Sequence, residues 1–209
     1  MSQFFSIHPD NPQPRLIRQA AAMVRDGAVI AYPTDSSYAL GCHLDDRTAV
    51  SRIRRIRGVD DNHYMTLMCR DLSELARYAR VNNVQFRLLK NNTPGSYTFI
   101  LEATKEVPRR LQHPKRNTVG IRIPNHPVAL ALLGELGEPL SSSTLILPGE
   151  QHPLSDAEEI RSHLDRQLDL MLDAGAVGLV PTTVIDLTGE TPVLVRRGKG
   201  DVAPFSIEE

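Results

Sequence analysis

The sequence contains no tryptophan, and its five phenylalanines and five tyrosines make up only 5% of the chain. Proteins that read single-stranded nucleic acids stack the bases on aromatic side chains, so this composition argues against single-strand base recognition. Cysteine is equally scarce, because Cys42 and Cys69 are too few to build a metal framework by themselves. We expect two reduced thiols and no disulfide, since no secretion signal accompanies them.

Long apolar runs are also missing. No stretch approaches the roughly 20 apolar residues that cross a bilayer. The N-terminal segment MSQFFSIHPDNPQPR has no basic region followed by an apolar core. We therefore expect a cytoplasmic protein that makes no membrane contact. With 209 residues, 41% of them hydrophobic, and no Gly-, Ser- or Pro-rich linker, the chain is predicted to form one domain over residues 1–209.

Several catalytic and metal-binding motifs are absent. The sequence has no GxxxxGK[ST], GxGxxG or GxSxG pattern. Its seven histidines show no metal-ligand spacing with Cys, Asp or Glu. We therefore predict surface or hydrogen-bonded histidines and no protein-bound metal. The histidines are His8, His43, His63, His113, His126, His152 and His163.

Charge is distributed unevenly along the chain, although the net charge is only −1. Residues 1–125 carry 19 Lys and Arg against 11 Asp and Glu, a balance of +8. Residues 126–209 carry 5 against 14, a balance of −9. A local field depends on where charges lie, so the first part can present a basic face to a polyanion. Alternatively, the two oppositely charged parts simply pack together.

Hydrophobic periodicity predicts helices and strands mixed along the chain. The predicted helices span residues 14–26, 47–57, 72–78, 84–90, 128–136 and 156–164. The last is expected to begin with a capping box of Ser155 and Glu158. The predicted strands span residues 28–32, 65–69, 97–102, 119–123, 139–142, 177–180, 184–187 and 193–196. We expect a three-layer α/β fold whose sheet contains antiparallel pairs, because the last connections are too short for crossover helices.

An arginine-rich helix is a notable concentration of charge. On a helix over residues 47–57, Arg52, Arg54 and Arg55 point away from the apolar stripe. They form either a solvated helix face or a set of phosphate contacts. Arg57 differs because it lies about 40° from Ile53 on the helical wheel, so it should point into a groove.

Three clusters of hydroxyl side chains lie near the ends of predicted strands. They occupy residues 33–41, 141–144 and 182–183. Such hydroxyls commonly satisfy their own backbone. However, ligands of open α/β sheets gather at strand ends, so the three clusters are also candidate binding elements for a small polar ligand.

Five ordered segments carry a family resemblance. They are Tyr32–Gly41 (YPTDSSYALG), Thr93–Leu101 (TPGSYTFIL), Thr118–Pro124 (TVGIRIP), Pro181–Asp186 (PTTVID) and Arg197–Gly198. In order and spacing they resemble the YPTETxYGLG, PGPxTxIL, TxGxRxP, PSTVxD and RxG motifs of the YrdC-like family, whose best-known members are threonylcarbamoyl-AMP synthases in tRNA modification. The match is closest to a paralogous branch. The resemblance implies a single YrdC-like domain with a mixed, twisted sheet of about seven strands and a basic concave cavity.

The resemblance also implies ligands and residue roles. Family synthases bind ATP, L-threonine and bicarbonate, and they release threonylcarbamoyl-adenylate and pyrophosphate. By this resemblance Ser36, Tyr38 and Arg122 would surround the threonine, with the guanidinium paired to its carboxylate. Thr183 and Arg197 would lie near the nucleotide phosphates. Mg²⁺ would arrive only as a companion of ATP, and the family cavity has been linked to double-stranded RNA or tRNA.

Departures from the synthase pattern concern two polar pairs. The K-x-R pair of synthases falls on Arg57 and Val59, and the S-x-N pair falls on Thr144 and Ile146. Losing one preorganised donor to developing charge costs about 10² to 10³ in rate, so efficient synthesis is doubtful. The candidate lining of a basic surface remains: Arg52, Arg54, Arg55, Arg57, Lys115, Arg116, Arg122, Arg196, Arg197 and Lys199.

Two functions stay open. The first is binding of double-stranded RNA, tRNA or a nucleotide in the cavity, with weak or no synthase activity. The second is a slow threonylcarbamoyl-AMP synthase, or an enzyme that adenylates another carbamoylated substrate. We assign no catalytic residue and expect no obligatory cofactor, although ATP and Mg²⁺ fit either function. The residues predicted to contact a nucleotide or RNA are Arg52, Arg54, Arg55, Arg57, Thr144, Thr183 and Arg197.

Overall fold

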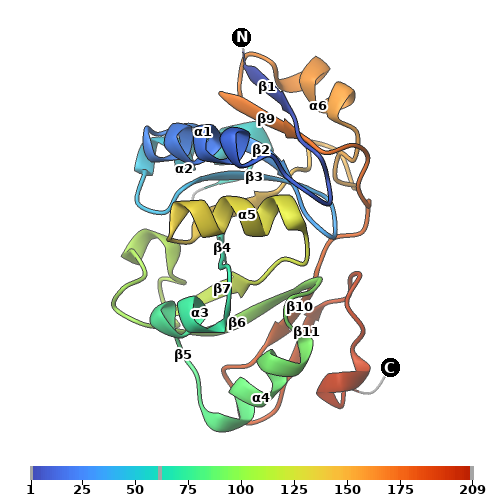
Figure 1. The fold of residues 1–209 in the computed structure, drawn as a ribbon. Helices are drawn as coiled ribbons and strands as arrows, with labels where there is room; N and C mark the ends of the chain where they lie inside the picture. The colour runs from blue at the N-terminus through green and yellow to red at the C-terminus, as the bar shows by residue number, and fades with distance from the viewer. Residues whose placement is uncertain (1, 61–62, 208–209) are drawn as a thin grey trace.

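The structure is a computed structural model that describes residues 2–60 and 63–207. One mixed sheet runs through the protein (Figure 1). Its strand order is β1–β9–β2–β3–β8–β4–β7–β6–β10–β11, with β5 paired to β6. Parallel pairs such as β4 with β7 occur beside antiparallel pairs such as β6 with β7. The strands are β1 (Gln3–Ser6), β2 (Ile30–Pro33), β3 (Tyr38–His43), β4 (Thr66–Met68), β5 (Ala79–Arg80), β6 (Tyr97–Ala103), β7 (Thr118–Arg122), β8 (Leu140–Thr144), β9 (Leu170–Asp173), β10 (Thr183–Asp186) and β11 (Val193–Arg196).

The predicted number of about seven strands is wrong, because the sheet has eleven. Strands β1, β3, β5 and β9 were not predicted. The four-residue strands β1 and β9 pair in parallel although they come from opposite ends of the chain, and such short segments show little periodicity of their own. Conversely, residues 177–180 form no strand. Leu179 and Val180 are 51% and 50% exposed there, in a connection between β9 and β10.

Helices cover both faces of the sheet (Figure 1). Helices α1 (Pro14–Arg25) and α5 (Pro127–Leu136) share one apolar cluster with Ile30 of β2. Helices α2 (Arg47–Arg57) and α6 (Ala157–Leu164) belong to a second cluster with Ala31 of the same strand. Because successive side chains of a strand point to opposite faces, the sheet separates two apolar cores in a three-layer arrangement. The remaining α-helices are α3 (Leu72–Tyr78) and α4 (Asn83–Asn92).

Helix caps place the arginine-rich helix. Helix α2 begins behind Asp46, whose carboxylate accepts a hydrogen bond from the Ala49 amide at 2.8 Å. It ends at Gly58, which has φ +62°, a left-handed conformation that favours glycine. The predicted capping box of α6 is wrong, because Asp156 rather than Ser155 occupies the N-cap and accepts from the Glu159 amide. Among the described residues, no helix is long and apolar enough to cross a membrane.

Candidate functional site

A cavity of about 450 Å³ is lined by the half of the sheet that runs from β8 to β11. Strands β4, β6, β7, β8, β10 and β11 all contribute side chains to its wall. Among the described residues, the lining contains three arginines and two histidines but no Asp or Glu. The lining residues are Arg57, His63, Tyr64, Met65, Thr66, Thr98, Ile100, Leu111, His113, Arg116, Thr118, Val119, Gly120, Ser143, Thr144, Ile146, Thr182, Val184, Val195 and Arg196. The cavity is therefore suited to an anionic ligand that also has an apolar part.

Cationic groups meet at one side of this cavity. Arg57, the last residue of α2, donates a hydrogen bond from Nη1 to Ser143 Oγ at 2.5 Å. The His63 Nε2 atom lies 3.3 Å from the same oxygen. Burial lowers the pKa of Arg57, and the nearby charge of Arg196 lowers it further. No Asp or Glu of the described residues lines the cavity beside these cations. Such a cluster favours phosphate or carboxylate groups.

Aromatic rings lie at another part of the cavity wall. The rings of Tyr64 and His113 stack with centroids 4.9 Å apart and an interplanar angle of 22°. Tyr64 is 46% exposed, so part of its ring is available to a ligand. Apolar side chains such as Ile100 and Val184 face the same space. A flat heterocycle can pack against this part of the wall.

A narrow extension of the cavity leads to Arg122. It has a volume of about 20 Å³, shares Thr98 and Thr144 with the main cavity, and is also lined by Ser37. A space of this size holds about one water molecule. Any larger group that enters here must therefore displace neighbouring side chains.

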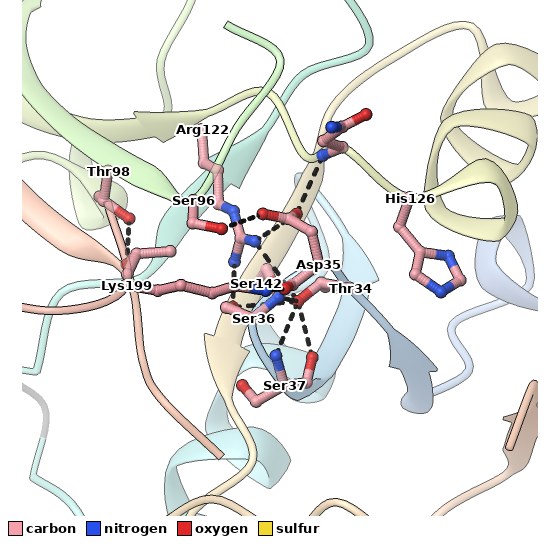
Figure 2. A network of polar contacts seen from close by, with 12 residues as sticks. Thr34, Asp35, Ser36, Ser37, Ser96, Thr98, Arg122, His126, Ser142 and Lys199 are labelled. Atoms are coloured by element: carbon pink, nitrogen blue, oxygen red, sulfur yellow. Dashed lines mark hydrogen bonds and ion pairs between the residues drawn. The ribbon is translucent and has the colours of Figure 1, made fainter. Parts of the chain in front are cut away.

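Arg122 is held by the first hydroxyl-rich loop (Figure 2). Its guanidinium donates to Asp35 Oδ1 at 2.6 Å and to Ser36 Oγ at 3.0 Å. Ser96 Oγ and Lys199 Nζ donate to the side chain and the carbonyl oxygen of Asp35, respectively. Burial alone would raise the pKa of Asp35, but the charge of Arg122 and the hydrogen bonds lower it below its usual value. Asp35 is thus an ionised partner of Arg122.

The structure brings together some of the predicted substrate residues. Ser36 and Arg122 are in direct contact. Tyr38 is fully buried, and its hydroxyl donates to the Gly175 carbonyl and accepts from the Ala174 amide, so it does not line the cavity. Burial raises the pKa of Tyr38 to about 12, which keeps its hydroxyl protonated at neutral pH.

The predicted nucleotide or RNA contacts divide into two groups. Arg57 and Thr144 line the cavity. Arg52 instead pairs with Asp169 at 2.8 Å. Arg54 donates to the His63 carbonyl, and Thr183 donates to the Gly200 carbonyl. None of these three lines the cavity, and neither do the exposed side chains of Arg55 and Arg197.

Arg196 takes the place at the cavity that the closing motif assigned to Arg197. Its guanidinium donates to the Thr182 carbonyl at 2.9 Å. The spacing of the RxG motif would have indicated this residue, because the arginine stands two positions before Gly198. The β10–β11 ladder also shifts register between Val184 and Ile185, opposite Arg196, and such irregularities redirect side chains.

Sequence reasoning also missed three further residues. His63 and His113 were expected to be surface or hydrogen-bonded histidines without a role in a site, but both line the cavity. Asp35 lies in the hydroxyl-rich cluster of residues 33–41 and was assigned no role there, whereas it is the ion-pair partner of Arg122. Only its place in the YPTD segment, ahead of Ser36, marked Asp35 as close to the site.

The mixed sheet and the arginine-lined cavity define an α/β protein with a basic cavity. The Sua5/YciO/YrdC family, described as "Telomere recombination", matches residues 22–198, and the chain belongs to this family. It is 62% identical over 205 residues to the uncharacterized protein YciO of Escherichia coli, covering 98% of this chain and 100% of that protein. The crystal structure of E. coli YciO superposes with a TM-score of 0.95 over the same shares of the two chains.

Threonylcarbamoyl-AMP synthases are more distant relatives. The Bacillus subtilis synthase is 32% identical over 184 residues, which are 87% of this chain and 53% of that protein. Pyrococcus abyssi Sua5 in complex with L-threonine has a TM-score of 0.86 at 28% identity, over 94% of this chain and 58% of that one. This chain thus spans a little more than half of these synthases. The predicted family and its paralogous branch are confirmed.

Proposed function

We propose that this protein binds a nucleoside phosphate such as ATP in its basic cavity, in the cytoplasm, and has weak or no threonylcarbamoyl-AMP synthase activity. The observation that carries the proposal is the cavity lining, in which Arg57, Arg116 and Arg196 face no described Asp or Glu. Phosphates would bind beside Arg57 and Arg196, and the base would pack near Tyr64. A volume of about 450 Å³ is typical of small-molecule sites.

The surroundings of Arg122 are the second observation in favour of weak or absent synthase activity. An amino-acid carboxylate would need the guanidinium that Asp35 already holds at 2.6 Å. The adjoining space of about 20 Å³ is far smaller than threonine. In addition, the apolar Ile146 lines the cavity at the position aligned with the asparagine of synthases. L-threonine could bind only after the loop between β2 and β3, residues 34–37, has moved.

Magnesium would enter this site with the nucleotide. The cavity lining offers no carboxylate among the described residues, and Mg²⁺ prefers oxygen ligands in an octahedral arrangement. Phosphate oxygens and water would therefore supply most of its ligands. The protein would recognise the charge of the complex through its arginines.

The deciding experiment measures pyrophosphate release from the purified protein with ATP, Mg²⁺ and bicarbonate, with and without L-threonine. In parallel, isothermal titration calorimetry measures ATP binding. We expect ATP to bind and threonine-dependent release to stay near background. Release that depends on threonine and disappears in Arg122→Ala would establish the alternative, an active synthase in tRNA N6-threonylcarbamoyladenosine formation. Absence of ATP binding would overturn the nucleotide proposal.

RNA is a second candidate ligand, because several cations are exposed outside or at the mouth of the cavity. Arg55, Lys115 and Arg116 are exposed, and Arg116 also lines the cavity. Contacts with a double-stranded RNA or tRNA backbone predict an affinity that falls steeply between about 50 and 200 mM salt. Fluorescence anisotropy with labelled tRNA tests this, and a flat salt response would count against RNA. Competition by ATP would place the RNA contact at the cavity.

A further inference from the structure

His63 occupies an unusual position beside the arginines of the cavity. Its Nε2 atom lies 3.3 Å from Ser143 Oγ, which already accepts a hydrogen bond from Arg57 at 2.5 Å. Its backbone is held as well, because Arg54 donates to the His63 carbonyl and the His63 amide donates to the Asp60 carbonyl. The imidazole is thus kept at the cavity wall.

The hydrogen-bond pattern around Ser143 accommodates a neutral imidazole in the free protein. Since Ser143 Oγ accepts from Arg57, its own hydrogen is free to be donated to Nε2 of a neutral imidazole. Burial lowers the pKa of His63, and the charges of Arg57 and Arg54 lower it further, against a smaller opposing effect of Asp60. Tyr64, His113, Arg116 and Arg196 complete the titratable and charged groups that line the cavity in the described chain. A second proton on His63 is therefore unfavourable while the cavity holds no anion.

We propose that His63 is a conditional cation of this cavity: a phosphate group carrying two or more negative charges binds beside Arg57 with uptake of one solvent proton at His63 Nε2. The inference rests on the proposed nucleotide function and deepens it. The negative charge of the entering anion offsets the repulsion of a protonated His63 by Arg57 and Arg54. Protonation of the ring therefore becomes favourable when the anion is bound. The protonated Nε2–H then donates to the phosphate or to Ser143.

This arrangement selects for terminal phosphates. A phosphodiester of an RNA backbone carries a single negative charge, which is already matched by Arg57. A polyphosphate or phosphate monoester carries additional charge, and only this charge makes protonation of His63 favourable. The cavity should therefore prefer a nucleotide or pyrophosphate to a diester-linked strand.

The test is calorimetric titration of pyrophosphate into the full-length protein, in two buffers with different ionisation enthalpies, between pH 6 and pH 8. Wild type is compared with His63→Gln, whose side-chain amide retains a hydrogen bond but takes up no proton. His152→Asn is the control, because His152 is exposed and does not line the cavity. Protonation of pyrophosphate itself is common to all three proteins and cancels in the comparison.

We expect wild type and His152→Asn to take up more protons than His63→Gln. The ratio of wild-type to His63→Gln affinity should increase as the pH falls, by at most about tenfold per pH unit. In wild-type protein, the His63 Cε1–H NMR signal should titrate at higher pH when pyrophosphate is present, a readout that needs no variant. Equal proton uptake by wild type and His63→Gln, with a ratio of their affinities that does not change with pH, would overturn the proposed role of His63 and leave the nucleotide function standing. Failure of pyrophosphate and ATP to bind at any pH would overturn the proposed nucleotide function as well.

Discussion

Arg122 and Asp35 form a buried ion pair, with Nη2 and Oδ1 2.6 Å apart and side chains only 7% and 11% exposed. The pair joins β7 to the loop between β2 and β3. The Asn125 amide donates to the same carboxylate oxygen at 2.9 Å. Strand β7 and the first motif of the chain are therefore positioned by a single carboxylate.

Asp35→Asn should destabilise the fold strongly. The substitution leaves the Arg122 guanidinium buried without its counter-charge, and breaking a buried pair costs about 3–5 kcal/mol. Urea denaturation followed by circular dichroism measures the loss. The control is Asp45→Asn, which removes the exposed partner of Arg110, since Asp45 is 71% exposed; such surface pairs contribute about 0–1 kcal/mol. Equal losses in the two variants would contradict the importance of the buried pair.

The same carboxylate should contribute to acid denaturation. The pKa of Asp35 is lower in the folded protein than in the unfolded chain, where it is about 3.9. Its contribution is therefore fully present above the unfolded value and is lost as the pH falls through the folded value. Unfolding free energies measured from pH 6 to pH 2.5 should decrease less steeply below about pH 4 in Asp35→Asn than in wild type. Parallel curves would be the contrary result.

Arg57→Ala should weaken ATP binding about tenfold or more, because a charge-assisted hydrogen bond contributes about 1.5–3 kcal/mol. Arg52→Ala is the matched control on the same helix. Arg52 pairs with Asp169 and does not line the cavity, so its removal should change affinity less than about twofold. Calorimetry of both variants at one ionic strength makes the comparison. Similar losses would place the nucleotide elsewhere.

Gly198→Ala should destabilise the closing motif by about 1–3 kcal/mol. A Cβ atom at Gly198 would lie 2.3 Å from the Pro181 carbonyl oxygen and 2.4 Å from the Thr182 carbonyl carbon. Backbone atoms cannot move aside as a flexible side chain can. Gly134→Ala, at an exposed position of α5 with nothing within 4 Å of its new methyl, should instead stabilise by about 0.5–1 kcal/mol. Thermal denaturation of both variants checks the opposite signs.

Local sequence patterns were sufficient for several elements near the site. The predicted bounds of α2 and α3 agree with the structure, because caps at Asp46 and Asp71 and apolar spacing mark both helices. The position of Arg57 beside the apolar stripe indicated a side chain directed into a groove, and it lines the cavity. These features depend on residues within a few turns of one another.

The sequence by itself determined the family, through five motifs in a fixed order, and the helices that cover the sheet. Only the tertiary structure decided that β1 pairs with β9, that Asp35 holds Arg122, and that His63 joins Arg57 at Ser143. Each of these contacts joins segments distant in the chain. Local periodicity records which face of an element is buried, but not which distant side chain it meets there, because that depends on how the whole sheet is assembled.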